Sequence, residues 1–195
     1  MFPSRIASVL GGGTGLLNNY SVSFDGTNDY VDIGNASDLN FTTGSFSIAA
    51  WIKTSAAGSN DGIVCKDLRW QFIMDSSNKL HFALYDGTNN PAISSATSIN
   101  TGEWTHVAAV RHTSDDKLYV YVDGVLDGSA TDSLTASIAS SDTVDIGRRQ
   151  DSGEFFNGNI DEVSIWNKAL SAGDISALYQ AKGTSDLNDD GNSAN

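Results

Sequence analysis

A carboxylate inside an apolar strand pattern is the first feature of the sequence that could do chemistry. Residues 158–166, Gly-Asn-Ile-Asp-Glu-Val-Ser-Ile-Trp, alternate as a β-strand does. Regular alternation places Asp161 on the same face as Val163 and Ile165, which favour burial. An unpaired buried charge is costly, so backbone N–H groups at a strand end or a bound cation must satisfy Asp161. Ca²⁺ prefers such oxygen ligands, and we keep both interpretations open.

A second calcium-like pattern lies near the end of the sequence. Residues 186–191, Asp-Leu-Asn-Asp-Asp-Gly, place oxygen-bearing side chains at Asp186, Asn188 and Asp190, with Gly191 where an EF-hand loop turns sharply. The glutamate that closes such a loop would fall beyond Asn195. A disordered acidic tail over residues 183–195 is the competing interpretation, and we prefer it.

Catalytic patterns, in contrast, are not evident. Asp161 and Glu162 are adjacent, so in a regular strand they face opposite sides and cannot flank one glycosidic bond. The three histidines are scattered, and His106 alternates with apolar residues, which favours a hydrogen-bonded core position. Cys65 follows Ile and Val and is expected to be a buried, inert thiol. We therefore expect a protein that is not an enzyme.

Aromatic and arginine side chains are candidates for a glycan-binding surface, because such sites combine ring faces with polar groups. The candidates are Trp70, Tyr85, Tyr119, Tyr121, Arg148 and Arg149. Trp70 alternates with Phe72 and Met74, so a core position is the competing interpretation for it. Tyr119 and Tyr121 face away from the apolar side of their strand and are expected to be exposed or covered by a partner.

Composition narrows the classes of partner. The 195 residues include 11 basic and 24 acidic side chains, which gives a net charge of −13. Without a basic patch, binding to nucleic-acid phosphates or to an anionic membrane is disfavoured. No apolar run approaches the length of a membrane span, so membrane insertion is not expected.

Short strand patterns joined by Gly, Asn, Asp and Ser turns fill residues 20–182, which predicts one all-β domain. Residues 46–53 form the clearest strand. Hairpins are expected at Asp75–Asn78 and at Asp123-Gly124, whereas residues 86–100 are expected to be a loop. The one helix is expected over residues 170–182, with Ser171 and Asp174 forming a capping box.

Residues 1–19 form an arm outside the strand pattern, with a Gly-rich hinge at residues 11–13. The arm carries six apolar side chains and no core of its own, which is typical of a docking segment. These side chains are Phe2, Ile6, Val9, Leu10, Leu16 and Leu17.

Three sequence blocks together resemble the laminin-G-like domains of the concanavalin A-like lectin/glucanase superfamily. They are 22–33 (VSFDGTNDYVDI) with 46–52 (FSIAAWI); 102–111 (GEWTHVAAVR) with 118–124 (LYVYVDG); and 144–147 (VDIG) with 156–166 (FNGNIDEVSIW). The resemblance implies a two-sheet antiparallel jelly-roll sandwich with one short C-terminal helix. It also implies a structural calcium ion held by Asp161, with Asp25 and the carbonyl of Gly44 as weaker candidates.

The expected function is that of a non-catalytic binding or structural module. No signal-peptide core is evident at residues 1–10, which favours a subunit of a larger assembly. The preferred hypothesis is a bacteriophage virion decoration or fibre protein. The arm would anchor it to a second copy of the chain or to a capsid. The alternative is a calcium-dependent glycan-binding adhesion module of a secreted or cell-surface bacterial protein.

Overall fold

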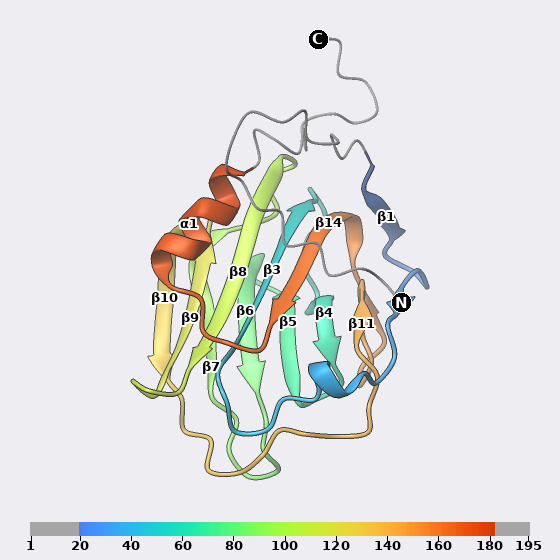
Figure 1. Ribbon diagram of the computed structural model, residues 1–195. Coiled ribbons are helices and arrows are strands. Elements are labelled where there is room, and N and C mark those ends of the chain that lie inside the picture. Colours follow the sequence, from blue (N-terminus) through green and yellow to red (C-terminus); the bar gives the residue numbers. More distant parts are fainter. Residues whose placement is uncertain (1–19, 182–195) are drawn as a thin grey trace, which may run out of the picture.

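The computed structural model of the chain describes residues 20–181. Two mainly antiparallel sheets pack face to face, and one short helix lies outside the sandwich (Figure 1). This arrangement confirms the predicted all-β sandwich with a single C-terminal α-helix. Within residues 20–181, no helix has the length and apolar character needed to cross a membrane.

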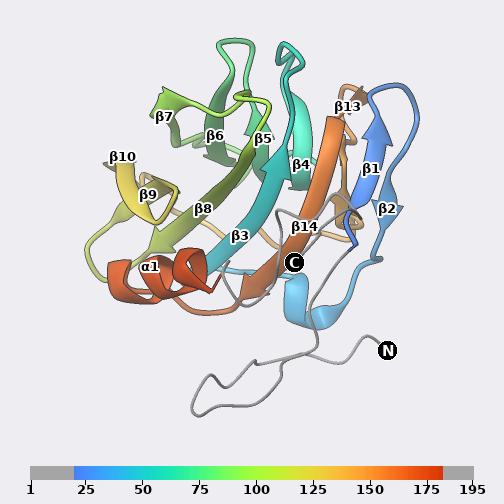
Figure 2. The same ribbon diagram turned by 90° about the horizontal axis from the view of Figure 1, so that it is seen from above.

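Sheet A has six strands, and in it the first strand of the described chain pairs with the last. The order is β1 (Val22–Asp25), β14 (Asn157–Trp166), β3 (Phe46–Lys53), β8 (Trp104–His112), β9 (Lys117–Val122) and β10 (Val125–Thr131). Strand β1 pairs with β14 from Val22 opposite Ile160 to Asp25 opposite Asn157. The helix α1 (Ala172–Gln180) follows β14 and lies against the outer side of this sheet (Figure 2).

Sheet B forms the second layer. Its order is β12 (Arg148–Arg149), β13 (Glu154–Phe155), β4 (Asp61–Lys66), β5 (Trp70–Met74), β6 (Lys79–Leu84) and β7 (Ala92–Ser98). The short strand β11 (Asp145–Ile146) pairs with β4 and also with β2 (Val31–Asp32), and a 3₁₀ turn η1 (Ser37–Leu39) follows β2.

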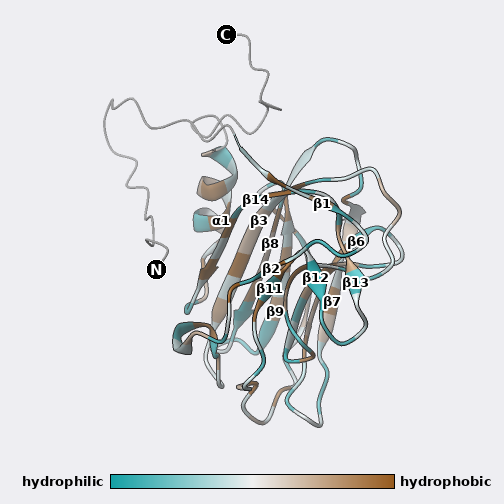
Figure 3. Ribbon diagram, turned by 90° about the vertical axis from the view of Figure 1, so that its right-hand side faces the viewer, coloured by the Kyte–Doolittle hydropathy of each residue, from teal (hydrophilic) through white to brown (hydrophobic). Residues whose placement is uncertain are grey.

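The core lies between the two sheets. Phe46, Trp70, Phe72 and Phe82 are completely buried there, and apolar residues recur along the strands while most connecting loops are polar (Figure 3). Trp70 belongs to this core cluster. The competing interpretation of Trp70 is therefore correct, and this side chain is not part of a ligand-binding surface.

Local turn and cap signals are confirmed. Asp123 and Gly124 have φ angles of 49° and 76° and join β9 to β10, as the type I′ preference of Asp-Gly predicts. Asn78 donates its backbone N–H to the carbonyl of Asp75, which closes the hairpin between β5 and β6. Ser171 and Asp174 cap α1 reciprocally, so the helix begins where its capping box requires.

Two predictions about local structure are wrong. Residues 92–98, which the sequence places in a loop, form β7 at the edge of sheet B. Strand β14 contains a bulge: Asp161 lies opposite Trp51, but Ser164 lies opposite Ala49, so an extra residue is inserted between them. Glu162 adopts a positive φ of 49° within that bulge, which moves Val163 and Ile165 to the core face without Asp161.

Candidate functional site

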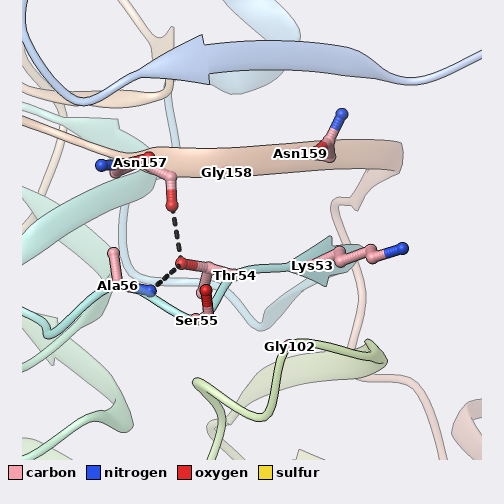
Figure 4. Close-up of a pocket in the computed structure, with 8 residues that line it drawn as sticks. All are labelled: Lys53, Thr54, Ser55, Ala56, Gly102, Asn157, Gly158 and Asn159. Carbon is pink, nitrogen blue, oxygen red and sulfur yellow. Dashed lines mark hydrogen bonds between the residues drawn. The ribbon is translucent and has the colours of Figure 1, made fainter.

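A shallow cavity of about 400 Å³ lies where β3 ends and β14 begins (Figure 4). Its volume falls in the range of small-ligand sites. Three segments far apart in sequence supply its walls: the end of β3 with the loop after it, the turn before β8, and the start of β14. The lining residues are Lys53, Thr54, Ser55, Ala56, Gly102, Asn157, Gly158 and Asn159.

Thr54 holds these three segments together. Its hydroxyl donates to the backbone carbonyl of Asn157 at 2.6 Å and accepts the backbone N–H of Ala56 at 3.0 Å. Its own carbonyl accepts the backbone N–H of Gly102 at 2.8 Å. Because Thr54 is only 4% exposed, these bonds are shielded from water and fix the cavity wall.

Gly158 sets the spacing between the two strands. A Cβ atom at this position would collide with the backbone carbonyl of Lys53 and approach the Cβ of Thr54 to 2.9 Å. Its φ angle of +147° is one that other residues rarely adopt. The sequence therefore needs glycine here so that β14 can lie close to the end of β3.

Uncharged polar groups line the cavity. The Ser55 side chain is exposed, and neither it nor the Asn157 amide makes a side-chain hydrogen bond within residues 20–181. The Asn159 amide donates to the hydroxyl of Ser21 at 3.1 Å. Hydroxyl and amide groups both donate and accept, so they match the hydroxyl groups of a sugar.

A tryptophan lies on the strand next to the cavity, although it is not one of the eight lining residues. Trp104 on β8 lies directly opposite Lys53, so the two side chains share the outer face of sheet A. Trp104 is half-buried, and its indole N–H has no hydrogen-bond partner in the described part of the chain. Glycan-binding sites combine a partly exposed aromatic ring with side chains that donate and accept hydrogen bonds.

The cavity does not carry the groups for hydrolysis. Glycoside hydrolysis needs two carboxyl groups on either side of the scissile bond. Among the eight lining residues only Lys53 is ionisable. The serine, threonine and asparagine side chains at this place can form hydrogen bonds with a ligand.

The predicted calcium ligands do not come together. Because of the β14 bulge, Asp161 lies opposite Trp51 on the outer face of sheet A, so the expectation of a core-facing carboxylate is wrong. Asp161 accepts the backbone N–H of Glu162 at 2.7 Å. Asp25 lies opposite Asn157, four residues along β14, which is about 13 Å away.

Gly44, the third predicted ligand, is at the opposite end of β3. It precedes Phe46, whereas Asp161 lies opposite Trp51, so about seven residues, or roughly 23 Å, separate them. The Gly44 carbonyl accepts a hydrogen bond from Arg111 at 3.3 Å and lines a second, smaller cavity of about 240 Å³. These residues do not fit one calcium ion, and no group of three or more acidic, His or Cys side chains in residues 20–181 could hold a metal.

The predicted aromatic ligands are also separated. Tyr121 is 5% exposed and packs with Ile175 under α1, so it is covered by the chain's own helix and not by a partner. The Tyr119 hydroxyl donates to Asp115 at 2.6 Å, which raises the pKa of Tyr119 to about 12. The Tyr85 hydroxyl donates to the Gly87 carbonyl in the loop after β6.

Arg148 and Arg149 take part in ion pairs. The Arg148 guanidinium lies 3.6 Å over the ring of Tyr30 and binds the fully buried carboxylate of Asp145. Arg149 pairs with Asp151 at 2.7 Å and with Glu154 at 3.1 Å. Tyr30, which is 44% exposed, adds to the two predicted arginines an aromatic side chain that the sequence analysis did not single out.

Several predicted residues lie outside the described part of the chain. They are the arm residues Phe2, Ile6, Val9, Leu10, Leu16 and Leu17 and the tail residues Asp186, Asn188 and Asp190. Docking by the arm and metal binding by the tail therefore stay predictions.

The residues that line the main cavity were not identified from the sequence. They are small, uncharged and placed in turns, and no single one carries a motif. The nearest signal was the run 157–159, Asn-Gly-Asn, two residues before Asp161, because its central glycine marks a close approach of two backbones.

Comparison with known proteins defines the class. A family profile described as the concanavalin A-like lectin/glucanases superfamily matches residues 25–176. The chain belongs to this superfamily, and the profile that it matches is of the laminin-G type. A comparison with curated protein sequences finds no significant match.

Solved structures confirm the fold. The binding domain of Paraclostridial Mosquitocidal Protein 1 has a TM-score of 0.68 and 14% identity, covering 83% of this chain and 45% of that one. A heptameric SAP-like pentraxin from Limulus polyphemus has a TM-score of 0.62 and 22% identity, covering 82% and 81%. A candidate carbohydrate-binding protein from Bacteroides ovatus has a TM-score of 0.64 and 20% identity, covering 79% and 45%. The chain thus spans less than half of two of these three.

Proposed function

We propose that this chain is a non-catalytic glycan-binding module whose ligand occupies the cavity between the ends of β3 and β14. The observation that carries the proposal is the polar lining of that cavity, next to which the half-buried Trp104 pairs with the lining residue Lys53. Serine and asparagine side chains there can exchange hydrogen bonds with sugar hydroxyls, and the indole ring can pack on the apolar face of a sugar.

The relatives support the class of ligand. One of the similar structures is a toxin binding domain and another is a candidate carbohydrate-binding protein. The acidic surface, with its net charge of −13, disfavours nucleic acid and strongly anionic polymers as ligands. A glycan at a cell surface is therefore the partner that we propose, and an extracellular location is part of the same proposal.

A glycan array with the full chain is the first test, followed by titration calorimetry with a glycan that binds. Ser55→Ala and Asn157→Ala each remove one polar group from the cavity, and we expect each to weaken binding about fivefold or more, as loss of one hydrogen bond does. Trp104→Ala should weaken binding further, because it removes the ring contact.

The matched control is Ser129→Ala, since Ser129 is an exposed serine on β10, at the far edge of sheet A. This variant should bind like the wild type. Binding that survives Ser55→Ala, Asn157→Ala and Trp104→Ala together would place the ligand elsewhere and contradict the proposal.

The absence of catalysis is tested separately. We expect the full chain to release no reducing ends from a glycan that it binds, because the cavity carries no carboxyl pair. Release that disappears on mutation of one carboxylate would show that the module is an enzyme.

The role in a virion stays a prediction and is not part of this proposal. It rests on residues 1–19, which lie outside the described residues. Calcium dependence likewise stays a prediction, and it is measured by adding chelator to the same binding titration.

A further inference from the structure

Lys66 occupies a place that lysine rarely takes. It is on the core-facing side of β4, opposite Trp70, and its residue is 0% exposed. Lysine is almost never fully buried unless it is paired with an acid. Within residues 20–181, however, Lys66 forms no ion pair.

The one hydrogen bond of the Lys66 amine is to an amide. Its Nζ lies 2.7 Å from Oδ1 of Asn35. This distance brings the nitrogen close to the carbonyl carbon Cγ of the same amide, because the two atoms of a carbonyl group are about 1.2 Å apart. The Lys66 nitrogen and the acyl carbon of Asn35 are therefore neighbours, and attack requires the nitrogen to move from the amide oxygen toward Cγ.

The fold holds both partners in place. Asp145 of β11 lies opposite Cys65 of β4 on one side and opposite Asp32 of β2 on the other. Backbone hydrogen bonds from Ile33 to Val144 and from Val144 to Gly34, at 2.9 and 3.0 Å, continue this pairing up to Gly34, the residue before Asn35. These pairings bring Asn35, which is exposed in the segment between β2 and η1, beside Lys66 of β4.

The surroundings favour the neutral, nucleophilic amine. Burial lowers the pKa of the Lys66 ammonium, and the carboxylate of Asp142 acts in the opposite direction. Asp142 lies two residues before Val144, on the segment that runs beside Gly34 and Asn35. Because Asp142 and Lys66 form no ion pair, a proton can pass between them only through water.

We propose that Lys66 and Asn35 form an intramolecular isopeptide bond. The Lys66 ammonium gives one proton through water to the Asp142 carboxylate, and the free amine attacks Cγ of Asn35. The Cγ–Nδ2 bond then breaks, the leaving nitrogen takes up the Asp142 proton and a further proton from Nζ, and ammonium is released. The new amide keeps one hydrogen on Nζ, and no oxidant, reductant or cofactor is consumed.

This inference is independent of the proposed glycan site. It predicts a covalent loop that joins β4 to the segment between β2 and η1. Such a bond constrains the unfolded chain as a disulfide does, and Cys65, the chain's single cysteine, cannot supply an internal disulfide.

Intact mass spectrometry of the purified full chain is the test. We expect a mass lower than that of the sequence by one ammonia per molecule. In the tryptic digest, the fragments 6–53 and 54–69 should be joined, with no cleavage after Lys66, because trypsin does not cut at an acylated lysine. Separate fragments 6–53 and 54–66 and a full sequence mass would overturn the proposal.

Two variants and one mapping step secure the result. Lys66→Met replaces the amine with an apolar, unreactive side chain of similar length. The mass of this variant should equal the mass calculated from its sequence, with no loss of ammonia. Asp142→Asn should slow ammonia loss at least tenfold, and unchanged loss would overturn the role of Asp142. Cyclisation at Asn157-Gly158 would also release ammonia, but it leaves the two tryptic fragments separate, so a loss mapped to Asn157 counts against the cross-link.

Discussion

Trp51 of β3 and Tyr179 of α1 stack with ring centroids 5.7 Å apart and ring planes inclined by 24°. A second contact holds the same tyrosine: a Cβ on Gly124 would meet the Tyr179 Cβ at 2.9 Å. The helix is thus fixed over sheet A by one aromatic residue at its C-terminal turn. Ile175, which is completely buried, provides the other anchor.

Removal of this ring should loosen the helix. We expect Tyr179→Ala to lower the free energy of unfolding by about 1–2 kcal/mol, because Tyr179 is only partly buried and loses one aromatic pair. Tyr179→Phe keeps the ring and should be close to the wild type. Urea denaturation measures both, and equal stability of Tyr179→Ala and the wild type would show that the stack does not hold α1.

Asp86 ties two loops together. Its carboxylate accepts backbone N–H groups from Thr88 and Asn89 in its own loop and from Thr135 and Ala136 in a distant one, at 2.7–3.1 Å. These bonds hold the pKa of Asp86 well below its usual 3.8, the bond from Asn89 contributing most. A carboxyl with a depressed pKa stabilises the fold above its unfolded pKa and loses that effect as pH falls.

We expect Asp86→Asn to lower the melting temperature by a few degrees at pH 7, since an amide accepts fewer of these bonds. The difference from the wild type should shrink as the pH falls below about 4. Melting curves at several pH values measure it, with Asp38→Asn on the exposed turn η1 as the control. A difference that does not change with pH would show that the charge of Asp86 is not what stabilises the loops.

The alternation of apolar and polar residues along the chain was enough to predict the two sheets of the sandwich. It did not predict the strands that depart from this alternation. Strands 46–53, 70–74 and 117–122 have one strongly apolar face, so their burial follows from sequence. The β7 strand, Ala-Ile-Ser-Ser-Ala-Thr-Ser, has small polar residues on both faces and lies at a sheet edge. Local sequence does not distinguish such a strand from a loop.

The β14 bulge shows why the candidate site was harder to predict than the fold. One extra residue at Glu162 reverses the face of every residue before it, so Asp161 leaves the core side on which simple alternation places it. Glutamate at a positive φ carries no sequence signal, unlike the Asp-Gly turn at residues 123–124. The cavity beside β14 depends on pairing between Asn159 and Lys53, more than a hundred residues apart.

The Asp145–Arg148 pair should contribute strongly to stability. Asp145 is completely buried, and its carboxylate accepts hydrogen bonds from Arg148 and from the Thr143 hydroxyl at 3.3 Å. We expect Asp145→Ala to cost about 2–4 kcal/mol, somewhat less than for a fully buried pair, because the Arg148 side chain is 24% exposed.

The matched control for that variant is Asp151→Ala, which breaks the more exposed pair with Arg149 and should cost under about 1 kcal/mol. Denaturant titration of both variants gives the comparison. Equal losses would mean that burial of Asp145 does not determine the strength of its pair.

Because His106 is buried, we expect the fold to lose stability at mildly acidic pH. Its ring packs against both Trp51 and Tyr179, with centroids 5.2 and 6.2 Å away, and its Nδ1 is buried with no partner in residues 20–181. Burial lowers the pKa of His106 from 6.5 to about 4. Between these two pH values the unfolded chain binds a proton that the folded chain does not, so stability falls as the pH is lowered.

The fall attributable to His106 should approach about 3 kcal/mol between pH 6.5 and pH 4 and should not grow further below pH 4. His106→Leu fills the same site without a titrating group, so its stability should decline less over this range. His112→Gln, which changes a half-exposed histidine paired with Asp115, is the control and should keep the wild-type slope near pH 5. Urea denaturation at intervals from pH 7 to pH 4 measures the three slopes, and a His106→Leu slope equal to that of the wild type would assign the acid sensitivity to other groups.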